Sequence, residues 1–292
     1  MGTLDDKVAV ITGAGRGIGR SHALLFAREG AAVVVNDLGG GNDGSGSDAG
    51  PAQDVVDEIR ATGGRAVANT DNVATWDGAQ ALVDQAVAEF GRLDVVVNNA
   101  GILRDSFVAS ITESEWDSVV AVHLKGHAAV LHHAAAYWKA QFKAGQPVKA
   151  SVINTASASG TFVVNAGQAN YGAAKAGIAA LTQVAAQELE RYGVRVNAIA
   201  PVARTRLTLA TPGMGAIFAA EVPEGEFDLF HPDNIAPIVA YLAGDECSLS
   251  GEVFAVQGGA ISRLAPMRIG ETTETDGAWE IDDIHKRLSA WS

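Results

Sequence analysis

The stretch KVAVITGAGRGIG, residues 7–19, joins a short apolar run to a glycine-rich turn. An almost wholly apolar run such as residues 7–12 is typical of a parallel strand that helices cover on both faces. Glycines at 13, 17 and 19 let the backbone turn tightly and approach a charged group, and a following helix would present free N–H groups to that group. The stretch predicts a strand, a cradle for a pyrophosphate and a helix, in that order.

The same alternation of apolar runs and longer helical patterns continues along the chain, which predicts an α/β protein with one doubly wound parallel sheet. Strands are expected at residues 7–12, 31–36, 93–99, 150–155, 195–200 and 252–257. Helices are expected at residues 21–29, 52–62, 76–90, 113–142, 171–192 and 234–242. Glycines 30, 63, 91 and 193 are expected to close helices, and Thr112 with Glu115 forms the pattern of a capping box.

Composition narrows the classes of function. The 292 residues are 48% hydrophobic and 19% charged, which suffices for one large core. A formal net charge of −13 and the lack of a Lys/Arg cluster argue against a nucleic-acid partner and favour a small-molecule substrate or copies of the same chain. One cysteine, an acidic start and no apolar run near ~20 residues predict a cytoplasmic protein without an internal disulfide or a membrane contact. No metal site is expected.

The predicted plan is a single doubly wound α/β domain over residues 1–262, with a C-terminal extension over residues 263–292. Two stretches interrupt the regular pattern: the glycine-rich segment 39–51 and the irregular segment 204–232, which we expect to form a substrate lid. The extension carries Trp279 and Trp291. Docking of this extension on its own domain and docking on a neighbouring subunit both remain open.

Asp37 follows the second expected strand and is a candidate for selecting the cofactor. Its carboxylate can accept hydrogen bonds from both hydroxyls of an adenosine ribose and would repel a 2′-phosphate, which favours NAD over NADP. Arg16 in the glycine loop would instead attract that phosphate. We give Asp37 more weight because its clash with the phosphate is direct, although a solvated aspartate at a strand end is the simpler alternative. Asn98 and Asn99 end the next strand at the same edge, where they would line a ligand crevice.

The stretch QANYGAAK, residues 168–175, places Tyr171 and Lys175 four residues apart, on one face of a helix. A nearby cation can lower the pKa of a phenol from ~10 by ~1–3 units, and a positively charged nicotinamide would add to this effect. Tyr171 then becomes usable as a general acid or base. Ser157, just past an expected strand, would hold the substrate oxygen beside it. An ordinary helix pair is the alternative, which the preceding phosphate loop and serine-bearing strand make less favoured.

Together, TGAGRGIG, Asp37, NNAG, the serine, YGAAK and NAIAP occur in the order of the short-chain dehydrogenase/reductase family, which the chain resembles from about Leu4 to Ile261. The resemblance implies a Rossmann fold of seven strands and an NAD-dependent oxidoreductase that interconverts a secondary alcohol and a ketone. It implies Ser157, Tyr171 and Lys175 as the catalytic set. The expected cofactor-binding residues are Gly13, Arg16, Gly17, Ile18, Gly19, Asp37, Asp71, Asn72, Val73, Asn99, Ala100, Gly101, Tyr171, Lys175, Pro201, Val202, Ala203 and Thr205.

Three departures from the family pattern stand out. His123 in VHLKG replaces the usual asparagine, so it is either a fourth catalytic member in a proton relay or a buried structural histidine. One extra residue before Tyr171 makes Ser157 the candidate rather than Ser159. Val202 replaces the usual glycine after Pro201, and Thr205 comes one place early, which leaves their contacts with the cofactor open.

A narrower resemblance concerns the substrate. VVVNDLGGG, DVVVNNAGILRD, VHLKG and GQANYGAAKAG are similar to the (3R)-hydroxyacyl-CoA dehydrogenase part of the peroxisomal multifunctional enzymes of type 2. This implies an acyl-CoA substrate in lipid metabolism. A hydroxysteroid or another bulky alcohol or ketone is the alternative, and a non-catalytic NAD-binding scaffold is a third. The alanine-rich helices expected at residues 113–142 and 171–192 predict self-association, and the resemblance implies a homotetramer or a dimer.

Overall fold

In the computed structural model, one eight-stranded sheet organises the protein, with the strand order β3-β2-β1-β4-β5-β6-β7-β8. The strands are β1 (Val8–Thr12), β2 (Ala32–Asn36), β3 (Arg65–Asn69), β4 (Val95–Asn98), β5 (Ala150–Thr155), β6 (Val194–Val202), β7 (Val253–Gln257) and β8 (Ala260–Arg263). The structure describes residues 2–211, 215–220, 222–223, 225–265 and 269–291. Strands β1 to β7 run parallel, which confirms the predicted fold class.

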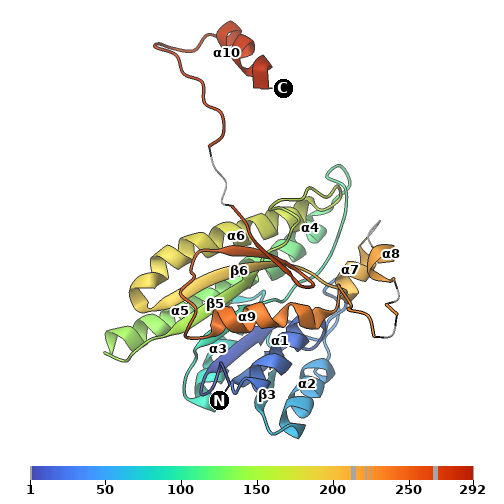
Figure 1. Ribbon diagram of the computed structural model, residues 1–292, viewed down its shortest axis with the longest axis vertical. Coiled ribbons are helices and arrows are strands. Elements are labelled where there is room, and N and C mark those ends of the chain that lie inside the picture. The colour runs from blue at the N-terminus through green and yellow to red at the C-terminus, as the bar shows by residue number, and fades with distance from the viewer. Residues whose placement is uncertain (1, 212–214, 221, 224, 266–268, 292) are drawn as a thin grey trace.

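Helices cover both faces of this sheet (Figure 1). They are α1 (Gly17–Arg28), α2 (Gly50–Ala61), α3 (Trp76–Phe90), α4 (Glu113–Val120), α5 (Gly126–Lys143), α6 (Ala169–Leu189), α7 (Arg206–Ala210), α8 (Gly215–Phe218), α9 (Ala236–Ala243) and α10 (Ile281–Leu288), with a π-helical turn η1 (Ala121–Lys125) and short 3₁₀ turns η2 (Glu190–Tyr192), η3 (Pro232–Asn234) and η4 (Ser289–Trp291).

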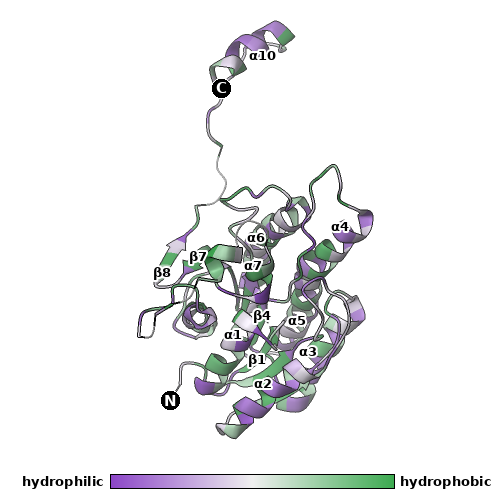
Figure 2. Cartoon of the chain, turned by 90° about the vertical axis from the view of Figure 1, so that its right-hand side faces the viewer, coloured by the Kyte–Doolittle hydropathy of each residue, from purple (hydrophilic) through white to green (hydrophobic). Residues whose placement is uncertain are grey.

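Alternate residues of β1 enter two different cores. Ala9 and Ile11 pack with α1, α2 and α9, whereas Val8 and Val10 pack with α3, α5 and α6. Because successive side chains of a strand point to opposite faces, an apolar strand is buried only when both faces are covered. The interior strands are accordingly hydrophobic in Figure 2.

The sheet has one strand more than the seven expected. Residues 260–263 fold back against β7 as the antiparallel edge strand β8, after a turn in which Gly258 has φ +53°. Residues 65–69 form β3 at the opposite edge, although no strand was assigned there from the sequence. Both edge strands are partly or wholly exposed and lack the continuous apolar signal of a central strand.

The predicted helix ends are confirmed. Glycines 30, 63, 91 and 193 have φ values of 98°, 84°, 80° and 77°, a region that L-residues rarely adopt. Thr112 and Glu115 form the capping box at the start of α4. The helix expected over residues 113–142 is, however, interrupted by η1, and this π-helical turn carries His123.

Chain order reverses between β1 and β4, since β2 and β3 lie on one side of β1 and the later strands lie on the other. The carboxyl ends of strands at such a reversal form the ligand crevice of doubly wound sheets. Among the described residues, no helix is both long and apolar enough to span a bilayer.

Candidate active site

A pocket of about 280 Å³ opens at the carboxyl ends of the strands, where the chain order reverses. It brings together the glycine loop, the ends of β2, β4 and β6, and the start of α6. Of the predicted site residues, its lining includes Gly13, Arg16, Gly17, Ile18, Gly19, Asp37, Asp71, Asn72, Val73, Asn99, Ala100, Gly101, His123, Tyr171, Lys175, Pro201, Ala203 and Thr205. Ser157 and Val202 are not among the lining residues.

The glycine loop leaves the backbone at the start of α1 open. Gly13 and Gly17 have φ values of +63° and +53°, and a Cβ on Gly19 would lie 2.2 Å from the carbonyl oxygen of Gly13. No side chain caps α1, so its first N–H groups remain free for an anion. Asn99 secures this arrangement by donating from Nδ2 to the carbonyls of Thr12 (3.0 Å) and Gly13 (3.1 Å). The loop therefore fits the pyrophosphate of a dinucleotide.

Asp37 anchors the loops on either side of the pocket. Its Oδ2 accepts a hydrogen bond from the Gly15 N–H at 2.8 Å, and its Oδ1 accepts one from the Gly39 N–H at 2.7 Å. Two cations, Arg16 and Arg206, lie nearby. Burial and the charge of Arg16 lower the pKa of Arg206, whereas the charge of Asp37 raises it. The pocket thus places one carboxylate against two guanidinium groups at the end where a ribose would lie.

The segment after β3 is held by Asn36 and Asn69. Asn36 Nδ2 donates to the carbonyl of Asp71 at 3.0 Å and to Oδ1 of Asn69 at 2.6 Å. Asn69 Nδ2 in turn donates to the Asp71 carboxylate at 2.7 Å. These bonds fix the position of Asp71, Asn72 and Val73 at the pocket wall.

Tyr171 and Lys175 lie on the same side of α6, as their spacing predicts. Lys175 Nζ is 5.6 Å from the centroid of the Tyr171 ring, and it donates to the carbonyl of Thr155 at 2.5 Å. Burial lowers the pKa of Lys175 to about 7. The sequence thus places the phenol and the amine in one site.

The expected effect of Lys175 on the phenol is wrong. The pKa of Tyr171 is raised, because burial disfavours the charged phenolate; a hydrogen bond with Ser157 works in the opposite direction, and the charge of Asp105 adds to the increase. The amine does not lower it, since Nζ points to the Thr155 carbonyl and is itself easily deprotonated. Tyr171 is therefore a neutral phenol at neutral pH.

Ser157 and Ser159 have different surroundings. Ser157 makes a side-chain hydrogen bond with the Tyr171 phenol and accepts one from the Ser159 N–H at 3.2 Å. Ser159 is buried and donates its hydroxyl proton to Gln168 Oε1 at 2.8 Å. The structure thus places Ser157, rather than Ser159, beside the phenol.

His123 packs edge-on against Tyr171, with ring centroids 5.1 Å apart and an interplanar angle of 86°. Its Nε2 lies 2.8 Å from the carbonyl oxygen and 3.1 Å from the amide nitrogen of Ile102, and its Nδ1 has no hydrogen-bond partner among the described residues. Burial and, secondarily, the charge of Lys175 lower the pKa of His123 to about 3. The imidazole is thus neutral and tied to the Ile102 backbone.

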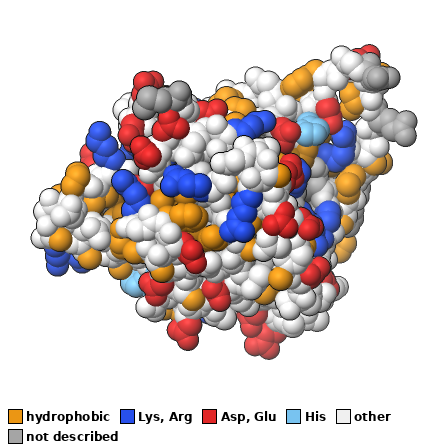
Figure 3. Space-filling model, turned by 90° about the horizontal axis from the view of Figure 1, so that it is seen from below, with side chains coloured by type: hydrophobic (Ala, Val, Ile, Leu, Met, Phe, Trp, Pro, Cys, Tyr) orange, Lys and Arg blue, Asp and Glu red, His pale blue; other side chains and the backbone are white. Residues whose placement is uncertain are grey.

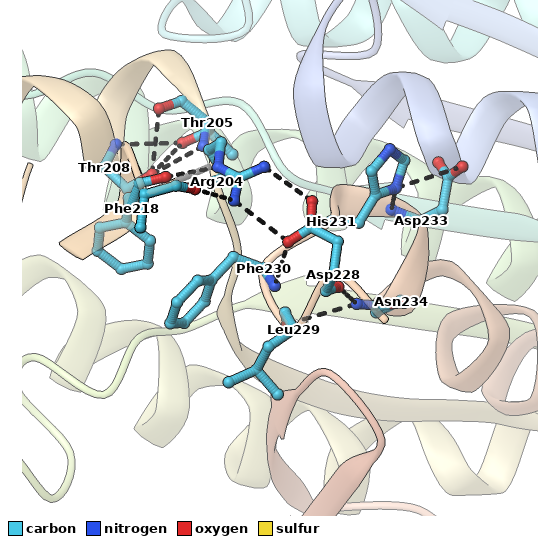
Figure 4. Close-up of polar contacts among 11 residues, drawn as sticks. Arg204, Thr205, Thr208, Phe218, Asp228, Leu229, Phe230, His231, Asp233 and Asn234 are labelled. Atoms are coloured by element: carbon cyan, nitrogen blue, oxygen red, sulfur yellow. Dashed lines mark hydrogen bonds and ion pairs between the residues drawn. The ribbon is translucent and has the colours of Figure 1, made fainter. Parts of the chain in front are cut away.

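An ion pair shown in Figure 4 joins Arg204, at the start of the segment 204–232, to Asp228 near its end. Arg204 holds Asp228 through two contacts, Nη1 to Oδ2 at 2.7 Å and Nη2 to Oδ1 at 3.2 Å. Arg204 Nε also donates to the Phe218 carbonyl at 2.5 Å, and the Phe218 ring packs edge-on against Phe230. Residues 212–214, 221 and 224 of the expected lid lie outside the described residues.

Thr205 and Val202 are less suited to a cofactor contact than the other predicted residues. Thr205 lines the pocket, but its hydroxyl caps α7 by accepting from the Thr208 N–H at 3.2 Å. Val202 is paired with Gln257 at the end of β6.

Sequence reasoning missed several residues of the pocket wall, among them Asn42, Thr155 and Arg206. Asn42, from the glycine-rich segment 39–51, donates to the carbonyl of Arg206 at 3.2 Å, and Thr155 receives the bond from Lys175. These contacts join segments that are far apart in the chain, so no local sequence pattern predicts them. The basic character of Arg206, directly after the NAIAP strand end, was the only available signal.

Comparison with known proteins agrees with this geometry. The family model for short chain dehydrogenases matches residues 7–210. The chain is 42% identical to hydroxyacyl-CoA dehydrogenase ChsB1 of Mycobacterium tuberculosis, over 98% of this chain and 88% of that protein. It is 42% identical to mouse peroxisomal multifunctional enzyme type 2, over 89% of this chain but only 33% of that enzyme.

A solved structure is also similar. The crystal structure of a short chain dehydrogenase from Mycobacterium avium superposes with a TM-score of 0.88 at 49% identity, covering 99% of this chain and 95% of that chain. The matched segment contains the glycine loop, Ser157, Tyr171 and Lys175. The protein belongs to the short chain dehydrogenase family and is an oxidoreductase that works with a nicotinamide cofactor.

Proposed function

We propose that the protein is an NAD-dependent 3-hydroxyacyl-CoA dehydrogenase. The observation that carries this proposal is that Tyr171 and Lys175 line a pocket whose other end is a phosphate loop, with Ser157 hydrogen-bonded to the Tyr171 phenol. The substrate class comes from the relatives, since one is named a hydroxyacyl-CoA dehydrogenase and another is a peroxisomal multifunctional enzyme.

The side chains divide the chemistry as follows. Ser157 and Tyr171 hold the oxygen of the substrate, because their hydroxyls already lie within hydrogen-bonding reach of each other. A nicotinamide cofactor held in this pocket would supply the redox chemistry, taking a hydride from the alcohol in oxidation and giving one to the ketone in reduction. Tyr171 exchanges the proton of the substrate oxygen. As a neutral phenol it is ready to donate that proton during reduction; during oxidation it must first lose its own.

Lys175 supports this proton exchange from a fixed position. The bond from Nζ to the Thr155 carbonyl holds the amine at the end of β5, close to the phenol ring. With a pKa of about 7, Lys175 changes protonation near neutral pH, so it can take up or release a proton during turnover. Its remaining donors are free to reach the ribose of a cofactor.

NAD is the proposed cofactor because Asp37 lines the pocket after β2, where its carboxylate would repel the 2′-phosphate of NADP. The carboxylate is held by two backbone N–H groups, so it cannot swing away without loosening the glycine loop. Arg16 and Arg206 lie near enough to favour NADP if Asp37 were lost.

Several further assignments belong to the same proposal. Residues 1–262 form the catalytic domain, residues 204–232 form its substrate lid, and residues 263–292 form an extension. We propose a homotetramer or a dimer located in the cytoplasm, without a nucleic-acid partner. On the face shown in Figure 3, Lys and Arg side chains are interspersed with Asp and Glu.

Purified protein tests this function directly. With NAD, 3-hydroxyacyl-CoA thioesters should generate NADH absorbance, whereas a parallel series of hydroxysteroids should react much more slowly. The same series with NADP should give a lower kcat/KM throughout. Faster turnover of hydroxysteroids would replace the proposed substrate class, and a complete lack of turnover that coexists with NAD binding would leave only a binding scaffold.

A further inference from the structure

Asp105 is a partly buried acid near the phenol of Tyr171, and the chemistry proposed above does not use it. It lies in the loop between β4 and α4. Its Oδ2 accepts a hydrogen bond from Gln168 Nε2 at 2.9 Å, whereas its Oδ1 is buried without a hydrogen-bond partner among the described residues. A buried acceptor without a partner lowers stability, so packing alone does not account for a carboxylate at this position.

Hydrogen bonds lead from Asp105 to the phenol. Gln168 Oε1 accepts a bond from the Ser159 hydroxyl at 2.8 Å. The Ser159 N–H donates to Ser157 Oγ at 3.2 Å, and Ser157 is hydrogen-bonded to the Tyr171 phenol. We call Asp105, Gln168 and Ser159 the Gln168 network. Its members are not among the residues that line the pocket, so the network can position the reacting groups without touching the substrate.

The carboxylate determines which way the Gln168 amide faces. An ionised carboxylate only accepts hydrogen bonds, so it selects the Nε2 end of the amide and leaves Oε1 toward Ser159. Asn165 Nδ2 supports this orientation, because it donates to Oε1 at 3.3 Å and to the Ser159 hydroxyl oxygen at 3.2 Å. A reversed amide would set two donors, Gln168 Nε2 and Asn165 Nδ2, against each other. The Ser159 hydroxyl is thereby fixed as a donor to Gln168.

The far end of the network fixes the role of Ser157. Because Ser157 Oγ already accepts from the Ser159 N–H, its own proton is available for the phenol or for the substrate oxygen. Successive hydrogen bonds in a buried chain polarise one another, so each bond strengthens the next. A change at Asp105 should therefore alter how firmly Ser157 holds the substrate oxygen.

Asp105 also acts on the phenol through space. Titratable groups near Tyr171 among the described residues are Asp105, Lys175 and His123, whose imidazole is neutral. Burial raises the pKa of Tyr171, and the charge of Asp105 adds to this increase. The carboxylate thus favours the protonated phenol, which is the form that donates a proton to a ketone.

We propose that Asp105 is a positioning residue of the reaction: through the Gln168 network it holds the Ser157 hydroxyl beside the Tyr171 phenol. Its charge additionally favours the protonated form of that phenol. The inference rests on the roles proposed above for Ser157 and Tyr171. Its effect is expected in turnover rather than in cofactor affinity, because the network lies outside the pocket lining.

Asp105→Asn tests the positioning role, because it keeps the size of the side chain but no longer selects one end of the Gln168 amide. With a 3-hydroxyacyl-CoA and NAD, we expect kcat to fall by about tenfold, as for the loss of roughly one hydrogen bond, and NAD affinity to stay nearly unchanged. Asp117→Asn, which removes an exposed carboxylate of α4, is the matched control and should behave as the unaltered protein. An unchanged kcat in Asp105→Asn would overturn the proposal.

A double-variant cycle separates positioning from a loosening of the loops. Ser159→Ala interrupts the Gln168 network but keeps the backbone N–H that Ser157 accepts. If Asp105 acts through Ser159, adding Asp105→Asn to Ser159→Ala should lower kcat by less than about twofold further, measured where kcat no longer changes with pH. A full additional tenfold loss would overturn the proposal, because the carboxylate would then act by another route.

The pH profile is a readout that a merely structural role would not move. Removing the charge of Asp105 should lower the pKa of the phenol, so the phenolate forms at lower pH. The rise of kcat/KM for alcohol oxidation should therefore move to lower pH by roughly half a unit to one unit in Asp105→Asn and stay in place in Ser159→Ala. An unchanged profile in Asp105→Asn would overturn the electrostatic part of the proposal.

Tyr171→Phe separates this inference from the proposed function. Lost turnover in Tyr171→Phe together with an unaffected Asp105→Asn variant would refute the role of Asp105 alone. Retained turnover in Tyr171→Phe would instead refute the proposed role of the phenol, and the inference with it.

Discussion

Lys175 Nζ donates a 2.5 Å hydrogen bond to the carbonyl of Thr155 and stands 5.6 Å from the centroid of the Tyr171 ring. The end of a central strand therefore fixes the amine, and the helix turn fixes the phenol relative to it. Lys175 is buried and Tyr171 is half-buried, and desolvation is the main influence on both: the pKa of the phenol is raised, and that of the amine is lowered to about 7.

Tyr171→Phe removes the proton-exchanging group and little else. We expect turnover to fall by about 10²-fold or more, the usual contribution of a positioned acid or base, while the affinity for NAD remains nearly unchanged. Steady-state kinetics and NADH fluorescence titration measure the two quantities. Tyr192→Phe, which alters a phenol in the 3₁₀ turn η2 that follows α6, is the control. Retained turnover in Tyr171→Phe would exclude the phenol as the proton-exchanging group.

The parts of this site that sequence predicts are the parts that local geometry specifies. A glycine that must have a positive φ, as at Gly13 and Gly17, and two side chains four residues apart on a helix are fixed by short-range rules. The central strands are equally predictable from the sequence, because burial on both faces requires a continuous apolar run.

Other features depend on contacts between distant segments. The interruption of the long helix at Ala121–Lys125 accompanies the packing of His123 against Tyr171 and Ile102, which no pattern in VHLKG reveals. The predicted direction of the Tyr171 pKa is wrong because the sequence shows the neighbouring lysine but not the desolvation of the phenol, which has the larger effect. Edge strands such as β8 are exposed, so their residues carry little hydrophobic signal.

Asp37→Asn should shift the choice of cofactor. The change removes the charge that would repel a 2′-phosphate and leaves Arg16 and Arg206 in place. We expect the ratio of NADP to NAD affinity to rise by about tenfold or more, given the strength of a partly screened charge contact. Titrations with NADH and NADPH measure this ratio. Asp43→Asn, in the exposed part of the neighbouring loop, is the control; an unchanged ratio in Asp37→Asn would assign the carboxylate to loop structure alone.

The Arg204–Asp228 ion pair should restrain the segment 204–232, because it joins the start of this segment to a residue near its end. Asp228→Asn preserves the shape of the side chain but leaves the partly buried guanidinium without its counter-charge, at a cost of about 1–3 kcal/mol. We expect a higher KM for the acyl-CoA substrate and faster proteolysis within residues 204–232, with NAD affinity nearly unchanged. Glu58→Gln, which breaks the exposed pair with Arg20, should change neither. Unchanged proteolysis would show that the ion pair does not restrain the segment.

His22 should make the protein sensitive to acid. It is fully buried in α1, both ring nitrogens lack partners among the described residues, and burial lowers its pKa to about 3. The unfolded chain takes up the proton near pH 6.5 whereas the folded chain does not, so stability is complete above pH 6.5 and falls toward pH 3 by up to about 1.4 kcal/mol per pH unit. His22→Leu should therefore raise the free energy of unfolding more at pH 5 than at pH 8. Urea unfolding at both values measures this, and an equal gain would contradict the assignment.

Gly101 and His123 should be coupled through direct contact. A Cβ at position 101 would lie 2.4 Å from Cε1 of His123, too close for either group unless the ring moves. Because the ring is tied to Ile102 and packed on Tyr171, its displacement should disturb both the cofactor loop and the phenol. Gly101→Ala should therefore weaken NAD binding and lower turnover.

The double variant isolates the cause. Asparagine at position 123 lacks the atom that meets the new Cβ, so Gly101→Ala should cost much less in a His123→Asn background than in the unaltered protein. The difference is a coupling free energy, which for residues in contact is typically about 0.5–3 kcal/mol. Equal costs in both backgrounds would show that Gly101 is required by the cofactor rather than by the imidazole. Because asparagine is the usual residue of the family at this position, the relay itself is tested by His123→Phe, which keeps a ring but has no polar atom. Full turnover in that variant would identify His123 as a packing residue.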